Sequence, residues 1–505
     1  MDAVRFDPPI IMGGLVRGHY NRGSRLSPKH IMRTTKIVAT LGPSSDTDEI
    51  VTKLLDAGVD LFRLNASHGT HADHARQVAR IREVTKMYGR SAGILVDLQG
   101  PKIRLGKFEE GKVYLESGST FEITTDTTVM GNAQRACTGY SQFASDVQPG
   151  DRVLLADGTV ELRVLKSDGL SAHHEVVLGG WIGNNKGINL PGVAVSAPSL
   201  TKKDMADLAF FITQDIDFIA LSFVRKPADL VRLRLYLEEK EKSFPIIAKI
   251  EKPEAWEQLN AILEETDGVM VARGDLGVEM ALEKVPFIQK SIIERARQHG
   301  KFVITATQML ESMIESPVPT RAEVSDIANA IYDGTDAVML SAETGAGKYP
   351  VESVKMMARI AVEAEVSLKD RGFVRLPLRA SPSVAEMIAD GAYHTARIAG
   401  VSAIAVFTAT GSTARLIAKY RPPVPIYAFT SSEGVARQLS AVFGVRAIVA
   451  PMVSTTDEML AQMDRMLLDR NWMKIRDLVV MVAGQPIGRA GTTNLMKLHR
   501  VGELR

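Results

Sequence analysis

The chain has 505 residues, which is too many for one hydrophobic core and predicts two to four domains. Hydrophobic residues make up 45% and charged residues 24%, the usual range for soluble globular proteins, and the net charge is only +2. The sole cysteine, Cys137, excludes an intrachain disulfide and a cysteine metal cluster and fits a reducing compartment. No apolar run is long enough to span a bilayer. We therefore expect a cytoplasmic protein that binds no membrane. The net charge argues neither for nor against nucleic acid, which is not among the expected partners.

Residues 1–33 form an irregular segment with Pro8-Pro9, Gly13-Gly14 and scattered arginines. The segment lacks the apolar core of a secretory signal, and Asp2 and Asp7 interrupt the acid-poor pattern of a transit peptide. A flexible N-terminal arm is the interpretation that we favour.

From about Thr34 to Arg379, short apolar strands alternate with helical patterns, interrupted once. The expected strands are Thr35–Leu41, Leu61–Asn65, Gly93–Leu98, Phe218–Phe223, Pro245–Glu251, Gly268–Arg273, Phe302–Thr307 and Ala337–Ala342. The expected helices include Asp48–Ala57, His71–Tyr88, Lys202–Thr213, Lys226–Lys242 and Pro286–Gln298. Eight such units predict a (β/α)₈ TIM barrel formed by residues 34–101 and 199–379, with its chemistry at the carboxyl ends of the strands.

The interruption, residues 102–198, has alternating short strands punctuated by glycines, which predicts an all-β insertion after the third strand. The expected strands are Val113–Leu115, Thr120–Thr125, Arg152–Leu155, Val160–Leu165 and Glu175–Leu178. We expect it to form a small β-barrel. Because it emerges from the catalytic end, this domain is placed to act as a lid.

Residues 380–505 show a third pattern, typical of a separate α/β domain. Its expected strands are Ala403–Phe407, Pro425–Phe429, Arg446–Val449 and Leu478–Ala483. The stretch Leu376–Pro382 is the expected linker.

Polar residues gather where the barrel strands end. They include Arg63, Asn65, Ser67, His68, Asp97, Lys102, Arg104, Lys249, Glu251, Arg273, Asp275, Thr305, Thr307, Ser341 and Glu343. Buried charge is unfavourable unless it is paired or binds a ligand, so such a ring indicates a functional site. The carboxylates Glu251 and Asp275 suit Mg²⁺, and the lysine and arginine beside them suit an anionic substrate. A structural ion pair is the alternative for any single member.

Three of the polar residues invite other interpretations. Arg273 precedes Gly274, so it either touches substrate or braces the loop. His68 is more typical of a loop hydrogen bond or a nucleotide contact than of a metal ligand, since no second histidine lies at ligand spacing. The pair His173-His174 in the β insertion is expected to be solvated.

Nine stretches, in this order and spacing, resemble the pyruvate kinase family: TKIVATLGPSS, RLNASHGTH, GPKIR, NNKGINLPG, AKIEK, MVARGDLGVE, TATQMLESM, PTRAEVSDIANA and MLSAETGAGKYPVES. The resemblance covers the chain from Thr35 to the C-terminus. It implies that phosphoenolpyruvate and ADP are converted to pyruvate and ATP, the last step of glycolysis.

The resemblance also implies roles for individual residues. Glu251 and Asp275 match the ligands of Mg²⁺, for which Mn²⁺ is expected to substitute, and Lys249 matches the catalytic lysine. Thr307 matches a threonine associated with protonation of the enolate, although it is equally suited to binding a carboxylate. The remaining matches are Arg63 for phosphate and catalysis, Ala272, Arg273, Gly274 and Asp275 for substrate, and Asn65, His68, Arg104 and Lys186 for the nucleotide.

A monovalent cation is the one point of departure from many family members. Those members bind K⁺ through residues that match Asn65, Ser67, Asp97 and the carbonyl of Leu98. They carry Thr-Lys where this chain has Leu98-Gln99, and Glu where it has Lys102. The ammonium of Lys102 is placed to supply the charge that K⁺ brings elsewhere, so we expect K⁺ to be dispensable. Weak binding of K⁺ is the alternative, because Asn65, Ser67 and Asp97 are retained.

The C-terminal domain resembles the regulatory domain of the family. Its effector loop matches Thr408, Thr410, Gly411, Ser412 and Thr413, and hydroxyls with a glycine at a helix start favour phosphate binding. An ordinary N-capped helix is the alternative. The expected effector is a sugar phosphate or AMP, with Gly484–Thr493 and its Arg489 as the other wall. The match at Pro319–Glu323 implies a homotetramer.

Two rival functions remain open at the level of sequence. One is a Mg²⁺-dependent lyase or aldolase acting on a pyruvate enolate, against which Arg104, Lys186 and the insertion argue. The other is an inactive effector-binding regulator, against which the intact set Lys249, Glu251, Asp275 and Thr307 argues.

Overall fold

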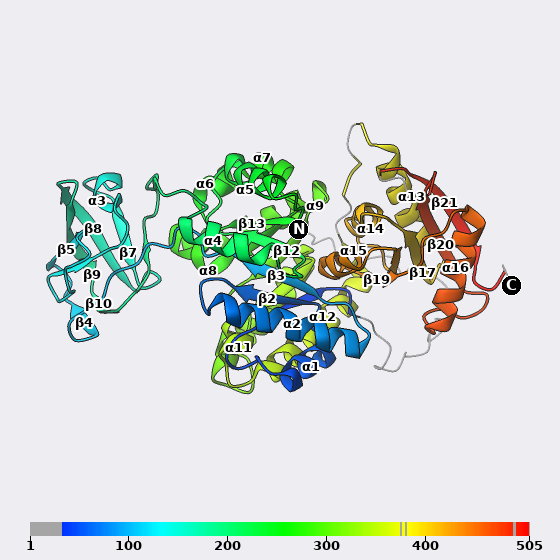
Figure 1. Ribbon diagram of the computed structural model, residues 1–505, viewed down its shortest axis with the longest axis horizontal. Coiled ribbons are helices and arrows are strands. Elements are labelled where there is room, and N and C mark those ends of the chain that lie inside the picture. Colours follow the sequence, from blue (N-terminus) through cyan, green and yellow to red (C-terminus); the bar gives the residue numbers. More distant parts are fainter. Residues whose placement is uncertain (1–32, 374–375, 379–380, 488–490, 504–505) are drawn as a thin grey trace, which may run out of the picture. The chain divides into compact units, whose positions relative to one another are not determined.

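The computed structural model describes residues 33–505 except 374–375, 379–380, 488–490 and 504–505 (Figure 1). The predicted N-terminal arm, residues 1–33, lies outside this part of the chain apart from Arg33. Within the described residues, no helix combines the length and the apolar character needed to cross a membrane.

Eight parallel strands close into a barrel in the order β1-β16-β15-β14-β13-β12-β3-β2, which confirms the predicted fold class. The strands are β1 (Lys36–Thr40), β2 (Leu61–Asn65), β3 (Gly93–Asp97), β12 (Phe218–Leu221), β13 (Ile246–Ile250), β14 (Gly268–Ala272), β15 (Phe302–Ala306) and β16 (Ala337–Leu340). Each of the eight predicted strands is present, with its ends within two residues of the prediction.

The barrel strands are apolar on both faces, which explains their continuous hydrophobic runs. Ile247 and Met270 point into the barrel and pack in one core with Phe218 and Phe302. Their neighbours in sequence, such as Val269, pack outward against the helices in a second and larger core. Polar residues therefore have room only at the strand ends, where the barrel opens.

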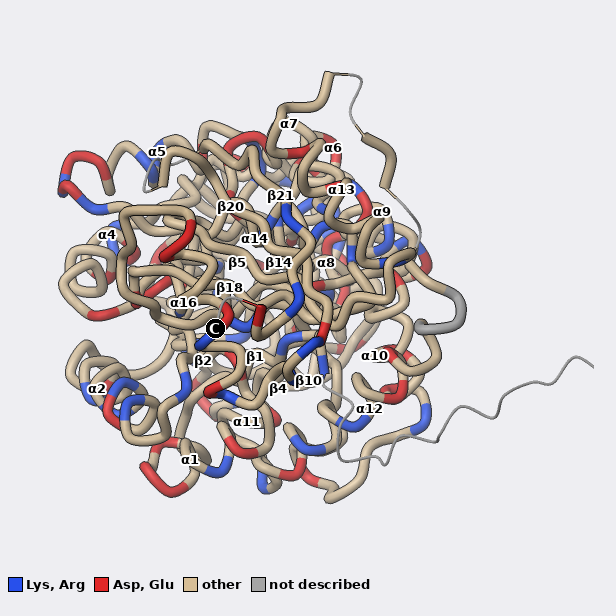
Figure 2. Tube along the Cα trace, turned by 90° about the vertical axis from the view of Figure 1, so that its right-hand side faces the viewer, with Lys and Arg blue, Asp and Glu red and all other residues tan. Residues whose placement is uncertain are grey.

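Helices surround the barrel strands in Figure 1. They are α1 (Asp48–Ala57), α2 (His71–Tyr88), α4 (Lys202–Phe211), α5 (Pro227–Glu239), α6 (Pro253–Glu257), α7 (Leu259–Glu265), α8 (Arg273–Glu279), α9 (Val285–Gln298), α10 (Arg321–Asp333), α11 (Ala342–Gly345) and α12 (Pro350–Arg371). Local signals fix their ends: Thr70 and Asp73 form a capping box at the start of α2, and Gly89 ends it at φ 65°. Figure 2 shows both signs of charge along α1 and α2, as expected for solvent-facing helices.

The insertion between β3 and α4 is built of strands that pair antiparallel, except that β5 and β6 pair parallel, and it has its own core of Phe121, Phe143 and Leu162. A six-stranded sheet has the order β11-β7-β8-β9-β5-β6, and β10 pairs with β4. The elements are β4 (Lys112–Leu115), β5 (Thr120–Thr124), β6 (Arg135–Cys137), α3 (Phe143–Asp146), β7 (Arg152–Leu155), β8 (Val160–Ser167), β9 (Ser171–Leu178), β10 (Gly180–Gly183) and β11 (Ile188–Asn189). The short strands β6, β10 and β11 were not predicted.

One expectation for the insertion was wrong. His174 is fully buried rather than solvated, and its Nδ1 lies 3.0 Å from the carbonyl oxygen of Phe121. Burial lowers the pKa of His174 to about 4, so the ring is neutral near pH 7. The reason is strand alternation: His174 shares a face of β9 with the buried residues Ala172 and Val176.

The C-terminal domain is a five-stranded sheet in the order β19-β18-β17-β20-β21, with helices and an apolar core on each face. Its elements are α13 (Val384–Ile398), β17 (Ala403–Phe407), α14 (Ser412–Ala418), β18 (Ile426–Thr430), α15 (Glu433–Gln438), β19 (Val445–Val449), α16 (Thr456–Asp469), β20 (Leu478–Gly484) and β21 (Thr493–Arg500). Four strands are parallel and match the prediction, whereas β21 is an antiparallel edge strand that was not predicted.

Candidate active site

Lys249 lies at the centre of a buried polar cluster at the carboxyl end of the barrel. Its Nζ is 3.2 Å from Oδ1 of Asp97 and 2.8 Å from Oε1 of Glu251, and it donates a 2.7 Å hydrogen bond to Oγ of Ser222. The Lys249 side chain is 11% exposed, and the two carboxylates are 1% exposed. Three strand ends, those of β3, β12 and β13, therefore meet on one ammonium group.

The cluster keeps Lys249 charged in spite of its burial. Burial by itself lowers the pKa of a lysine, but the carboxylates of Asp97 and Glu251 outweigh it and raise the pKa of Lys249 above its ordinary value. The pKa of the Asp97 carboxyl group is lowered. Burial alone would raise it, but the positive charges of Lys249 and then Arg63 outweigh that effect. An ammonium ion and a carboxylate are therefore the resting forms of this pair.

Arg63, at the end region of β2, joins the cluster from the other side of Asp97. Its Nε donates to Oδ2 of Asp97 at 2.8 Å, and its Nη1 donates to Oγ1 of Thr40 at 3.0 Å. The arginine is 9% exposed. Asp97 thus holds two cations at fixed positions on the barrel rim, an arrangement suited to an anion with more than one charge.

Glu251 and Asp275 are the two carboxylates predicted to bind the metal. Oε2 of Glu251 accepts a 2.8 Å hydrogen bond from the backbone N–H of Phe223. Oε1 is buried and, although Lys249 is near enough for ion pairing, it has no hydrogen bond of good geometry. Burial, with a contribution from the charge of Asp275, raises the pKa of Glu251. A buried carboxylate oxygen that faces a cation without a well-aligned hydrogen bond is suited to a further cation as ligand.

The donor set at this position fits Mg²⁺ better than a transition metal. Among the described residues, no three histidine, cysteine, aspartate or glutamate side chains come together to hold a metal ion. Mg²⁺ is commonly bound through one or two carboxylates, with water and substrate oxygens completing its shell. The side chain of Asp275, in the first turn of α8, is 28% exposed, so its carboxylate is open to the rim.

The start of α8, which directly follows β14, and the loop after β15 meet at Thr307. The Thr307 hydroxyl accepts a 2.8 Å hydrogen bond from the N–H of Gly274 and donates a 2.6 Å hydrogen bond to the carbonyl of Ala306. Thr307 has a φ of 69°, an unusual value for a β-branched residue, which indicates that the surrounding contacts impose this conformation. The predicted substrate residues Gly274 and Thr307 are therefore in direct contact.

Of the two roles considered for Arg273, the structure favours bracing. Its Nη1 lies 2.6 Å from Oδ2 of Asp326, and its Nη2 donates a 2.7 Å hydrogen bond to the carbonyl of Thr307. Its Nε donates to the carbonyl of Ala306 at 3.3 Å. Because its N–H groups are engaged by these acceptors, the guanidinium supports the Thr307 loop rather than facing substrate.

The residues predicted to contact the nucleotide belong to two parts of the structure. Asn65 ends β2 and His68 lies in the loop that follows, where the backbone N–H of His68 donates to the carbonyl of Asn65 at 3.1 Å. Partial burial, and then the positive charge of Arg104, lowers the pKa of His68. Arg104 begins the insertion and donates to the carbonyl of Asn185 at 3.1 Å, beside the exposed Lys186.

Three of the four predicted K⁺ ligands, namely Asn65, Asp97 and the carbonyl of Leu98, already have partners within the chain. Oδ1 of Asn65 accepts the N–H of Ser67 at 3.1 Å, and the carbonyl of Leu98 accepts the Ser222 hydroxyl at 2.7 Å. Asp97 is held by Lys249 and Arg63, as described above. Nζ of Lys102 lies 4.0 Å from Oδ1 of Asp275, so its charge reaches the metal side of the rim.

Two residues of the cluster were missed by sequence reasoning. Ser222 follows β12 and donates to the carbonyl of Leu98, and Thr40 ends β1 and hydrogen-bonds Arg63. Both are buried hydroxyls at the end of an apolar strand, which is the signal that would have identified them.

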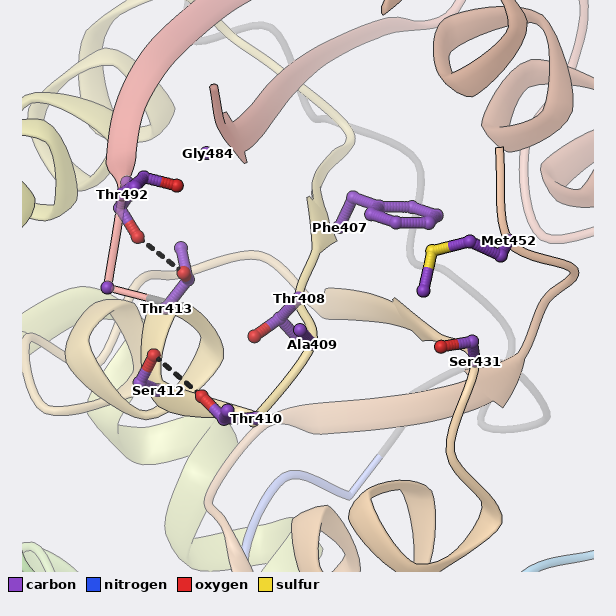
Figure 3. A pocket seen from close by; sticks show the side chains of 12 residues that line it. Phe407, Thr408, Ala409, Thr410, Ser412, Thr413, Ser431, Met452, Gly484 and Thr492 are labelled. Carbon is purple, nitrogen blue, oxygen red and sulfur yellow. Dashed lines mark hydrogen bonds between the residues drawn. The ribbon is translucent and has the colours of Figure 1, made fainter. Parts of the chain in front are cut away.

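The predicted effector loop lines a pocket in the C-terminal domain (Figure 3). Thr408, Thr410, Ser412 and Thr413 line one part of it, and Gly484 and residues 491–493 line another, while Arg489 lies outside the described residues. The Thr410 hydroxyl donates to that of Ser412 at 3.1 Å. Gly411 has a φ of 81°, and its N–H donates to Oγ1 of Thr408 at 3.0 Å. No described residue of the lining is charged.

The fold and the charged cluster at its rim are those of a (β/α)₈-barrel enzyme acting on an anionic substrate. Residues 32–354 match the family model "Pyruvate kinase, barrel domain", and residues 386–499 match "Pyruvate kinase, alpha/beta domain". The chain therefore belongs to the pyruvate kinase family, and it is a phosphotransferase.

Individual relatives agree over nearly the full chain. A pyruvate kinase of Geobacillus stearothermophilus is 46% identical over 94% of this chain and 81% of its own length. One from Mycobacterium intracellulare is 45% identical over 93% of this chain and 99% of its own length. The crystal structure of a pyruvate kinase from Cryptosporidium parvum superimposes with a TM-score of 0.87 at 37% identity, covering 94% of this chain and 98% of the other.

Proposed function

We propose that the enzyme transfers the phosphoryl group of phosphoenolpyruvate to ADP at the barrel rim, giving pyruvate and ATP. The observation that carries this proposal is the buried ammonium of Lys249, held between Asp97, Glu251 and Ser222 where three strands end. Phosphoryl transfer needs mainly positioning and charge neutralisation, and a fixed, desolvated cation provides both.

In this reaction a β-phosphate oxygen of ADP attacks phosphorus, and the bond between phosphorus and the bridging oxygen breaks. The electron pair of that bond stays on the bridging oxygen, which leaves the enolate of pyruvate. Lys249 is positioned to balance charge on the transferring group and on this oxygen. Arg63, held by Asp97 and Thr40, binds the phosphoryl oxygens from the other side.

Glu251 and Asp275 are the residues that would hold Mg²⁺, and the hydrogen-bond-deficient Oε1 of Glu251 supports this assignment. When bound there, Mg²⁺ supplies positive charge to the oxygens of the substrate. Mn²⁺ is expected to substitute for it. A second divalent ion would arrive with the phosphates of ADP.

The carboxylate of the substrate is assigned to the backbone N–H groups of Gly274 and Asp275 at the start of α8. The N–H of Gly274 now donates to the Thr307 hydroxyl, so substrate would take over this donor and release the hydroxyl. Thr307 is then free either to bind the carboxylate or to pass a proton, through water, to the enolate carbon. Ala272 ends β14 and sets the position of this turn.

The nucleotide is assigned to Asn65 and His68 on the barrel and to Arg104 and Lys186 on the lid insertion. Lys186 is exposed, next to the carbonyl of Asn185 that Arg104 holds, so the two lid cations lie on adjacent segments of the insertion. Closure of the lid would bring them to the phosphates of ADP.

K⁺ is proposed to be dispensable because Lys102 brings a tethered positive charge to the rim. The test is activity in a buffer that contains Mg²⁺ and tetramethylammonium but no K⁺. We expect substantial activity there. An increase of many-fold on adding KCl, but not on adding NaCl, would show that the charge of Lys102 does not replace the ion.

Regulation and assembly are also proposals. The hydroxyl-lined pocket of Figure 3 is assigned to a phosphorylated effector, a sugar phosphate or AMP. A homotetramer is supported by large apolar side chains on the surface near α9, since Leu282 is 72% and Phe287 is 67% exposed. The cytoplasm is the proposed location.

One assay separates the proposed reaction from its rivals. Purified enzyme is incubated with phosphoenolpyruvate, ADP and Mg²⁺, and both ATP and pyruvate are measured, with EDTA as the control. We expect ATP and pyruvate to form in equal amounts, and we expect EDTA to abolish the formation of both. Aldol cleavage of a pyruvate adduct without ATP formation would support a lyase, and the absence of any turnover would support a regulator.

A further inference from the structure

A cavity lies beside the active-site rim where the lid insertion joins the barrel. It is lined by Lys102 and Asn189 from the insertion and by Phe223, Arg225, Lys252 and Glu279 from the barrel, among others. None of Asn189, Lys252 and Glu279 takes part in the reaction as described above. Their contacts, however, connect the lid to both proposed metal ligands.

Glu279 is the centre of this connection. Its Oε1 accepts a 2.8 Å hydrogen bond from Nδ2 of Asn189 and lies 2.6 Å from Nζ of Lys252. The Glu279 side chain is 1% exposed and that of Lys252 is 12% exposed. A carboxylate buried to this extent is stable only with such partners, so the three side chains are held as one unit.

Each of the three side chains belongs to a different functional element. Lys252 directly follows Glu251 in sequence. Glu279 follows Asp275 by four residues within α8, so the two carboxylates lie on the same face of that helix. Asn189 is the last residue of the lid strand β11, which pairs with β7.

The chain that returns from the lid is anchored separately. Arg225 donates hydrogen bonds to the carbonyls of Val195 and Ala197, the latter at 2.7 Å. The return connection at Val195 and Ala197 is therefore held to the barrel without Asn189. Loss of the Asn189 side chain would leave this connection in place and remove only the contact between β11 and α8.

We propose that Glu279 is a positioning residue that couples the lid to the metal site. Its hydrogen bond with Asn189 ties the position of α8 to that of β11. Its ion pair with Lys252 ties the segment that carries Glu251 to the helix that carries Asp275. Lid and metal ligands are thus positioned together. The inference rests on the proposed function, since it assigns Glu251 and Asp275 to Mg²⁺.

A purely structural ion pair is the simpler interpretation, so the test needs a measurement that general stabilisation would not change. Asn189→Ala removes the lid contact and leaves the pair of Lys252 with Glu279 intact. Gln134→Ala, an exposed position on the same insertion, is the matched control. Glu279→Gln keeps an acceptor for Asn189 but removes the negative charge that Lys252 requires.

The first readout is hydrogen–deuterium exchange of the full chain without metal or substrate. We expect Asn189→Ala to raise exchange in both residues 187–193 and α8, and Gln134→Ala to change neither. Faster exchange in residues 187–193 alone would overturn the coupling. Unchanged exchange in both segments would do the same.

The second readout is direct binding of Mn²⁺, followed by its electron paramagnetic resonance signal. We expect both Asn189→Ala and Glu279→Gln to weaken binding by about tenfold, as is typical for outer-shell partners of metal ligands. The double variant should weaken it by less than the product of the two, because both act through one connection. Full additivity, or wild-type binding by Asn189→Ala, would refute the proposal.

These outcomes are separable from failure of the proposed function. If wild-type enzyme binds Mn²⁺ but forms no ATP, the reaction is wrongly assigned while the coupling stands or falls on exchange and metal binding. If Glu279→Gln does not fold, Lys252→Gln, which removes the positive charge at the other contact of Glu279, takes its place in the cycle.

Discussion

The barrel rim and the C-terminal pocket are both suited to phosphate, but the rim is built from charged side chains and the pocket from neutral groups. The rim holds Lys249, Asp97 and Glu251 in a buried network of full charges. The pocket presents hydroxyls and backbone at the start of α14, with no charged side chain among its described lining residues. Figure 3 shows hydroxyls of Ser412 and Thr413 there, each engaged by a neighbouring hydroxyl.

The difference corresponds to two tasks. Buried charges are costly to desolvate, and they are useful where charge must be stabilised in a transition state. Neutral donors bind an anion without a fixed charge that would need a partner when the anion leaves. The rim is therefore expected to depend steeply on charge and pH, and the pocket to depend weakly on both.

Lys249→Met should have the largest effect, because it removes the cation at the centre of the rim. A fall in kcat of at least about 10³-fold is expected, comparable to the loss of a main electrostatic stabiliser. Steady-state kinetics of ATP formation would measure it. Lys53→Met, at an exposed ion pair on α1, is the control and should keep wild-type kcat. A decrease below tenfold for Lys249→Met would remove the distinction between rim and pocket.

Arg273→Met tests whether the rim depends on bracing as well as on charge. Without the guanidinium, the carbonyl of Thr307 and the carboxylate of Asp326 lose their partner. We expect kcat to fall by roughly 10²-fold, the cost of a small displacement of reacting groups, with little change in metal binding. Direct Mn²⁺ binding combined with kinetics would check this split. If KM for phosphoenolpyruvate rises with kcat unchanged, Arg273 touches substrate after all.

The pH dependence of metal binding sharpens the comparison further. Burial raises the pKa of Glu251, and only its ionised form binds a cation, so the proton and the metal compete. Affinity for Mn²⁺ should be highest above this raised pKa and fall by up to about tenfold per pH unit as pH drops through it. Binding titrations at several pH values, repeated with Glu251→Gln, would measure this. A pH dependence that persists in Glu251→Gln would assign the proton to another group.

The smallest effect is expected in the pocket. Thr410→Val removes a hydroxyl that donates to Ser412 and lines the site. Activation by a sugar phosphate or AMP should then require a several-fold higher effector concentration, in line with loss of one or two hydrogen bonds. Effector titrations of the initial rate would show the shift. An unchanged half-saturating concentration would place the effector elsewhere.

The barrel strands could be predicted because burial on both faces leaves a continuous apolar run that ends where charge begins. The same logic does not detect β10 or β11, which have only four and two residues. Strand β21 was missed because most of its side chains are exposed, so an edge strand with little core resembles a loop. His174 was expected to be solvated because histidine is polar, although its position in the alternating pattern of β9 places it on the buried face.

The candidate site was predictable to the extent that its residues sit at strand ends. Lys249, Glu251 and Asp97 meet because parallel strands of a barrel end on one rim. Ser222 and Glu279 were not identified, since their roles depend on contacts across the fold. Glu279 and Asn189 are 90 residues apart, and a hydrogen bond of that span leaves no local pattern in the sequence.

The central claim is that the rim moves a phosphoryl group from phosphoenolpyruvate to ADP. Phosphorus-31 NMR of the wild-type enzyme with both substrates and Mg²⁺ follows that group directly. The expected result is loss of the phosphoenolpyruvate signal with an equal gain of ATP γ-phosphate, and no change when EDTA is present. Release of the phosphorus as inorganic phosphate, or a phosphoenolpyruvate signal that persists with Mg²⁺, would contradict it.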